Sequence, residues 1–196
     1  MGNANAQNVN ASNGGYESRR IIDNKKFHVL YEEVVIDKTV DEVWNEVSGN
    51  FVNSERIAHS INESRCLSGN LTTGIGAERY LNINFQGRTI EVKERIIDFQ
   101  ECGNHREFTY DVYESKGSPL NVKTYNTWIV REGDDGKTYL GTVFIFRANI
   151  GILTGLLGKQ LVKSGSLRNG VLTYKHFLET GEKKVVAEKL NELYPR

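Results

Sequence analysis

Two neighbouring segments alternate between apolar and polar residues, and this pattern constrains the fold more than any other feature of the chain. In residues 78–85, and from Ile90 onwards in residues 88–96, every second residue is apolar, apart from one charged residue in each segment. This alternation is typical of strands with one buried and one solvated face. Gln86-Gly87 lies between the segments and is typical of a two-residue hairpin turn. The sequence therefore predicts an antiparallel hairpin.

Each of these apolar stretches is interrupted by a single charged residue, Arg79 on the first strand and Glu94 on the second. The hairpin places the two opposite each other on the buried side of the sheet. Desolvating such a pair costs several kcal/mol unless hydrogen bonds compensate. Three roles stay open: a structural ion pair that braces one end of a cavity, an anchor for the polar end of a ligand, and an acid/base pair for catalysis.

Composition favours one reduced, globular domain. The length of 196 residues leaves room for a sizeable core, and Lys plus Arg equals Asp plus Glu at 25 each. With no net charge and no basic run, we expect no nucleic-acid partner. No apolar stretch approaches the ~20 residues of a membrane span. Cys66 and Cys102 are isolated, so we expect a cytoplasmic location and no metal site. The sequence has no P-loop and no dinucleotide fingerprint, so we expect no cofactor.

The chain divides into three parts. Residues 1–20 are expected to be a disordered tail, because the first fifteen residues are rich in Asn, Ala, Ser and Gly. Residues 21–181 form the predicted ligand-binding domain. Residues 182–196 are a charged extension that we expect to be helical.

The order of predicted elements indicates an α+β fold. Phe27–Ile36 is a first strand, Thr39–Glu42 is a capping box that opens a short helix, and a second short helix covers 52–58. Between 152 and 178 apolar residues recur at helical spacing. The sequence therefore predicts a seven-stranded curved antiparallel sheet wrapped around a long C-terminal helix, with two short helices after the first strand. The remaining six strands are predicted at 63–69, 78–85, 88–99, 106–115, 121–132 and 138–148.

Five segments, taken in their order and spacing, carry a resemblance to a known superfamily. They are Thr39–Trp44, Gly74–Arg79, Glu94–Asp98, Pro119–Val122 followed by Tyr125, and Tyr174–Gly181. In this order the chain resembles the START-like or SRPBCC superfamily, whose helix-grip fold encloses a hydrophobic cavity. It is most similar to the polyketide cyclase/dehydratase-like branch, which in turn resembles abscisic acid receptors and lachrymatory-factor synthase.

The resemblance implies roles for particular residues. In the receptors and the synthase, an Arg and a Glu at the positions of Arg79 and Glu94 point into the cavity, where they hold the ligand or serve catalysis. Tyr125 matches a tyrosine that lines the receptor cavity. The hairpin between Asn82 and Arg88 is too short to hold the receptor gate loop, so a hormone receptor is not expected.

Further candidates for ligand contact come from the later strands and the long helix. A four-residue loop at 116–119 sets Tyr110 opposite Tyr125 on the cavity side and turns Trp128 to the other face. A register shifted by one residue would bury Trp128 and expel Tyr125, but the resemblance favours the first register. Both tyrosines can equally be ordinary core residues. The remaining candidates, which are core residues by default, are Phe144, Leu153, Leu157 and Leu161.

The leading hypothesis is that the chain binds a small hydrophobic molecule, a lipid or a polyketide-like compound, in an internal cavity as a carrier or sensor. Arg79 and Glu94 would contact its polar end. The alternative is a cofactor-independent cyclase, dehydratase or isomerase, with Glu94 as acid/base and Arg79 stabilising negative charge. Interaction with a protein partner is a third hypothesis and has the least support of the three. Whether the chain is an enzyme, and its oligomeric state, stay open at this point.

Overall fold

The computed structural model describes residues 20–22, 24–85, 87–117, 122–148, 155–156, 160 and 165–196. All but the last residue of the predicted N-terminal tail falls outside this part of the chain. The strands are β1 (Arg20–Ile22), β2 (Lys25–Ile36), β3 (Ile61–Cys66), β4 (Glu78–Phe85), β5 (Arg88–Cys102), β6 (His105–Lys116), β7 (Val122–Glu132) and β8 (Thr138–Ala148). The helices are α1 (Val40–Val47), the 3-10 helix η1 (Phe51–Arg56), α3 (Ser166–Thr180) and α4 (Ala187–Leu193).

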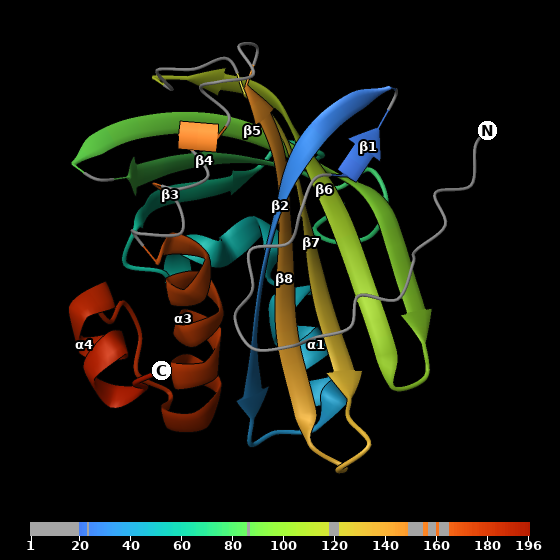
Figure 1. Ribbon diagram of the computed structural model, residues 1–196, viewed down its shortest axis with the longest axis vertical. Helices are drawn as coiled ribbons and strands as arrows, with labels where there is room; N and C mark the ends of the chain where they lie inside the picture. The colour runs from blue at the N-terminus through green and yellow to red at the C-terminus, as the bar shows by residue number, and fades with distance from the viewer. Residues whose placement is uncertain are drawn as a thin grey trace.

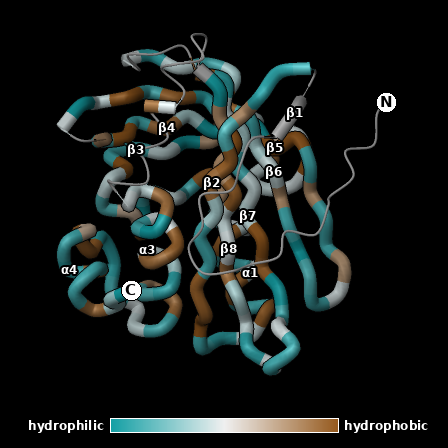
Figure 2. Tube along the Cα trace, viewed as in Figure 1, coloured by the Kyte–Doolittle hydropathy of each residue, from teal (hydrophilic) through white to brown (hydrophobic). Residues whose placement is uncertain are grey.

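The strands form one curved antiparallel sheet in the order β1-β2-β8-β7-β6-β5-β4-β3. Helix α1 packs on β7 and β8, α3 packs on β2 and β8, and α4 lies beside α3 on the side away from these strands (Figure 1). All seven predicted strands are present, and the three-residue β1 adds to the edge beside β2. Along the strands the hydropathy changes back and forth between hydrophilic and hydrophobic residues, as expected for a sheet with two different faces (Figure 2).

The predicted hairpin of β4 and β5 is confirmed, including its register. Ile83 pairs with Ile90, Leu81 with Val92, and Arg79 with Glu94. Gly87 in the turn has a φ of +76°, a left-handed conformation that glycine adopts without a steric cost. The alternation of side chains and the turn together determined this part of the sheet.

The predicted register of β6 and β7 is wrong by one residue. Tyr110 pairs with Asn126, and Asp111 pairs with Tyr125. Because a shift of one residue turns every side chain to the opposite face, Trp128 points to the concave side and Tyr125 does not. The observed register buries Val130 completely, so the burial of β7's larger apolar residues decides which face is inside.

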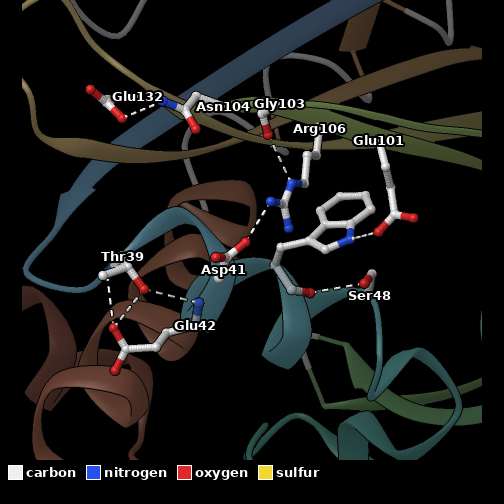
Figure 3. A network of polar contacts seen from close by, with 10 residues as sticks. Thr39, Asp41, Glu42, Ser48, Glu101, Gly103, Asn104, Arg106 and Glu132 are labelled. Carbon is white, nitrogen blue, oxygen red and sulfur yellow. Dashed lines mark hydrogen bonds and ion pairs between the residues drawn. The ribbon is translucent and has the colours of Figure 1, made fainter.

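Helix α1 is tied to the sheet by the polar contacts of Figure 3. Thr39 and Glu42 form the predicted capping box at its start. The Trp44 indole donates a hydrogen bond to the Glu101 carboxylate, although the ring itself is buried. Arg106, next to the turn between β5 and β6, pairs with Asp41. These contacts fix α1 against the concave face of the sheet.

Helix α3 is shorter than predicted. It begins at Ser166, because Gly165 before it has a φ of +64°. A left-handed residue interrupts an α-helix, so the prediction of one continuous helix over 152–178 is wrong at Gly165. Most of residues 149–164 lie outside the described part of the chain.

Helix α4 packs on α3, and the two lie side by side in Figure 1. Leu190 is 1% exposed and clusters with Leu172 of α3 and with Val185. His176 of α3 joins the same region by two hydrogen bonds, one between Nδ1 and the Tyr194 hydroxyl (3.1 Å) and one between Nε2 and the Glu182 carboxylate (2.9 Å). The boundary placed after residue 181 stays a prediction, but the segment that follows it is packed against the domain.

The packing of α4 can be tested by one pair of substitutions. Leu190→Ala should lower the free energy of unfolding by about 2–5 kcal/mol, since it removes a buried side chain and leaves a cavity. Leu193→Ala is the matched control, because Leu193 is 49% exposed, and its effect should stay within about 0.5 kcal/mol. Urea unfolding measures both. Two equally small effects would contradict the packed position of α4.

Candidate functional site

A cavity of about 540 Å³ lies between the sheet, η1 and the two C-terminal helices. Four buried residues mark its inner end, namely Arg79, Glu94, Tyr110 and Tyr174. Exposed residues mark its mouth: His59, Ser60, Asn84 and Glu188. Much of the wall between these ends is apolar, with Phe51, Leu81, Ile83, Phe85, Phe108 and Trp128 among its members. The arrangement is that of a small-molecule site, apolar with a few polar groups.

The cavity exists because α3 presents small side chains to the sheet. Ser166, Gly170 and Thr173 line the space along this helix. A Cβ placed on Gly170 would have its nearest neighbour in the Trp128 ring, at 3.9 Å, which is ordinary van der Waals contact. Protein interiors are otherwise close-packed, so this unfilled volume is a distinctive feature of the molecule.

Arg79 and Glu94 form a fully buried ion pair at the inner end. The Nε atom of Arg79 donates a hydrogen bond to Oε2 of Glu94 (2.6 Å), and Nη2 forms an ion pair with the same oxygen at 2.6 Å. Nη1 of Arg79 donates to the Phe51 carbonyl (2.5 Å) and to the Ser54 hydroxyl (3.2 Å) in η1. The guanidinium also lies over the Phe51 ring, 4.0 Å from its centroid. Arg79 therefore joins β4, β5 and η1.

The electrostatics of the pair follow from its burial. Desolvation raises the pKa of the Glu94 carboxyl, and the charge of Arg79 opposes that rise. The carboxyl is therefore a stronger base than an exposed glutamate. Because Arg79 has a neutralising partner and donates to three acceptors, it is the structural centre of the inner end.

A chain of hydrogen bonds crosses the sheet to Tyr110. The Thr142 hydroxyl donates to Oδ1 of Asn126 (2.8 Å), and Nδ2 of Asn126 donates to the Tyr110 oxygen (2.8 Å). All three residues are buried. Burial raises the pKa of Tyr110, so its hydroxyl stays protonated at neutral pH.

A second tyrosine hydroxyl belongs to the same end of the cavity. Tyr174 of α3 meets Trp128 edge to face, with ring centroids 5.1 Å apart. Burial raises the pKa of Tyr174 to about 12. To the described residues its hydroxyl makes no hydrogen bond, although it is nearly buried. Two neutral phenols therefore accompany the ion pair.

The structure brings together Arg79, Glu94 and Tyr110, as the sequence predicted. Tyr125 is a correction: it lies on the other face of β7, where its ring packs beside Phe27 at 6.1 Å. The shifted register of β7 is the cause. Phe144 has the predicted inward face and stacks on Phe146 (5.4 Å), but it is not one of the described residues that line the cavity.

The helical candidates Leu153, Leu157 and Leu161 lie outside the described residues, and their contact with a ligand stays a prediction. Sequence reasoning missed the lining residue Trp128, Asn126, which lies behind Tyr110, and the lining residue Tyr174. The register of β7 hid the first two. Tyr174 fits the helical spacing of apolar residues, and that same spacing explained it as core.

Two classes of site find no support within the described ranges. Among those residues there is no cluster of three or more His, Cys, Asp or Glu side chains that could hold a metal ion. No helix there combines the length and the apolar character that crossing a membrane requires.

Comparisons with known proteins bear on the fold. No protein-family model and no curated protein matches the chain. Among solved structures, a START superfamily protein from Mycobacterium smegmatis has a TM-score of 0.61 at 11% identity, covering 79% of this chain and 99% of that one. Norcoclaurine synthase from Thalictrum flavum, a point mutant bound to a transition-state analogue, has a TM-score of 0.60 at 14% identity, covering 84% and 98%. Ara h 8.0201 has a TM-score of 0.55 at 15% identity, covering 79% and 99%.

Each of these similar proteins is covered almost entirely, and each shares the curved sheet that closes on a C-terminal helix. At identities of 11–15% the likeness concerns the fold. The expectation drawn from the order of sequence motifs is confirmed at that level. The chain has the helix-grip fold of the START-like, or SRPBCC, proteins.

Proposed function

We propose that this chain binds a small hydrophobic molecule, a lipid or a polyketide-like compound, in its cavity and acts as a carrier or sensor. The observation that supports the proposal most is the unfilled volume of about 540 Å³, bounded by aromatic and aliphatic side chains. Ligand pockets typically span about 300–1,000 Å³ and are mostly apolar. An apolar volume of this size loses dispersion contacts when it is empty, and a hydrophobic ligand would restore them.

Solved structures of the same fold are consistent with this proposal. One norcoclaurine synthase structure is described as a complex with dopamine and hydroxybenzaldehyde, two small aromatic molecules. At 14% identity the similarity supports a common fold and gives no information about the ligand of this chain. The chemistry of the ligand must therefore come from the lining residues of this chain.

We assign Arg79 a structural role in this binding site. Its Nε and Nη1 already donate to Glu94, Phe51 and Ser54, and its Nη2 is paired with Glu94. Breaking a buried pair by removing one partner costs about 3–5 kcal/mol. Arg79 thus holds η1 and Glu94 in place at the inner end, and the ligand meets the groups that Arg79 positions.

The free thiols Cys66 and Cys102 are consistent with the reducing cytoplasm, where we place this activity. The apolar lining of the cavity supports a small hydrophobic ligand as the binding partner.

Filling the cavity tests the proposal. Gly170→Leu would place a side chain in the space beside Trp128, because the position has room for a Cβ. We expect it to weaken binding of N-phenyl-1-naphthylamine, an uncharged apolar dye, at least tenfold. Titration of the dye's fluorescence measures the affinity.

Gly170→Ala is the matched control. It should raise the free energy of unfolding by up to about 1 kcal/mol, since glycine is costly inside a helix, and it should bind the dye within about threefold of the natural protein. If Gly170→Leu folds and binds the dye as tightly as Gly170→Ala does, the dye does not enter this cavity, and the proposal is wrong.

A second candidate function is cofactor-independent acid/base catalysis as a cyclase, dehydratase or isomerase. One observation favours it: the Glu94 carboxyl has a raised pKa and lines the cavity together with two tyrosine hydroxyls. A carboxyl made more basic by burial is suited to proton transfer near neutral pH. Glu94 would carry the proton, and Arg79 and Tyr110 would stabilise the negative charge that develops on the substrate.

Glu94→Gln separates this candidate from simple binding. If an enolisable substrate is converted by the natural protein, the variant should lose turnover by at least ~100-fold and keep dye affinity within about threefold. Unfolding in urea should show a loss of about 3–5 kcal/mol, because Arg79 is left without its counter-charge. Glu114→Gln, at the half-exposed pair with Lys93, is the control and should leave the urea midpoint nearly unchanged, because solvent screens such a pair. Unchanged turnover in folded Glu94→Gln would exclude Glu94 from the chemistry.

A further inference from the structure

The direction of the hydrogen bonds that reach Tyr110 determines what this residue offers to the cavity. Its oxygen accepts from Nδ2 of Asn126 at 2.8 Å. An amide NH₂ group is a donor only, so the tyrosine oxygen is the acceptor in this contact. Tyr110 therefore keeps its own proton to donate, and the described residues supply no acceptor for it.

The orientation of the Asn126 amide follows from Thr142. The Thr142 hydroxyl is 1% exposed, and its one hydrogen bond to the described residues goes to Oδ1 of Asn126. If the amide were reversed, Asn126 would present an NH₂ group to Thr142, and the threonine proton would lose this acceptor. A buried donor left unsatisfied is costly. Thr142 therefore fixes Asn126 as a donor to Tyr110.

The charges around the cavity are already balanced. Among the described lining residues, Arg79 is the permanent cation, and Glu94 neutralises it through a hydrogen bond from Nε and an ion pair with Nη2. Glu188 at the mouth is a further carboxylate. A carboxylate ligand would find no unpaired cation on these walls, and it would lie close to Glu94. Burying a charge without a partner is strongly unfavourable.

We infer that the ligand's inner end is an uncharged oxygen group, a hydroxyl or a carbonyl, which accepts the Tyr110 proton. This inference rests on the proposed function and specifies the ligand class: uncharged oxygenated amphiphiles bind, and fatty-acid anions are disfavoured. Tyr174 supplies a second neutral hydroxyl at the same end of the cavity. Thr142 and Asn126 are positioning residues, because they act through Tyr110.

Ligands with equal chains and different head groups test the inference. The affinities of 1-decanol, 2-decanone and decanoate are measured at pH 8 by displacement of N-phenyl-1-naphthylamine from the full-length protein. Decanol and decanone should bind at least tenfold more tightly than decanoate. Decanoate that binds as tightly as decanol would overturn the inference and leave the proposed function in place. If neither the dye nor any of the three binds, both fail.

Substitution of the tyrosine locates the donor. Tyr110→Phe should weaken binding of decanol and decanone about tenfold, the usual effect of losing one hydrogen bond, and change the dye's affinity less than twofold. Tyr125→Phe removes the same atom from the opposite face of the sheet and should change none of these values. Because Asn126 loses an acceptor in Tyr110→Phe, circular dichroism and dye binding report whether the variant is folded. Unchanged affinities for decanol and decanone in a folded Tyr110→Phe protein would overturn the assignment of Tyr110.

Discussion

The buried pair of Arg79 and Glu94 joins three parts of the molecule at one place. Arg79 donates to Glu94 on the neighbouring strand and to Phe51 and Ser54 in η1. Because such a pair tolerates no loss of a partner, β4, β5 and η1 have a fixed relative position. That position forms the inner wall of the cavity. The pair thus shapes the site, while the uncharged tyrosines beside it remain available to a ligand.

The cavity exists because the side chains on its two sides differ in size. The sheet contributes large residues such as Phe108 and Trp128, whereas α3 contributes Gly170 and other small residues. If α3 carried large apolar residues at these positions, the same fold would have a filled core. In the proposed function, the small residues of one helix face provide the space for the ligand, and the hydrogen-bond directions at Tyr110 provide the selectivity.

The sequence predicted the features that depend only on neighbouring residues, such as strand alternation and turns. Alternation and the Gly87 turn were sufficient for the β4–β5 register, including the partner of Arg79. The β6–β7 register depends on burial of distant residues such as Val130 and on the bulges where β5 pairs with β6. Neither distant burial nor a bulge can be recognised from a local sequence pattern. The cavity could not be predicted for a similar reason, since an apolar residue at helical spacing looks the same in the sequence whether it packs against a side chain or lines an empty space.

The central claim is that an uncharged hydrophobic molecule enters the space beside Trp128. The chain has two tryptophans, and only Trp128 lines the cavity, since Trp44 is buried between α1 and the sheet. The most direct test follows both indole N–H resonances in a ¹⁵N-edited NMR titration with 1-decanol. The account requires a saturable shift of the Trp128 resonance and an unchanged Trp44 resonance. An unmoved Trp128 resonance at saturating decanol would contradict it.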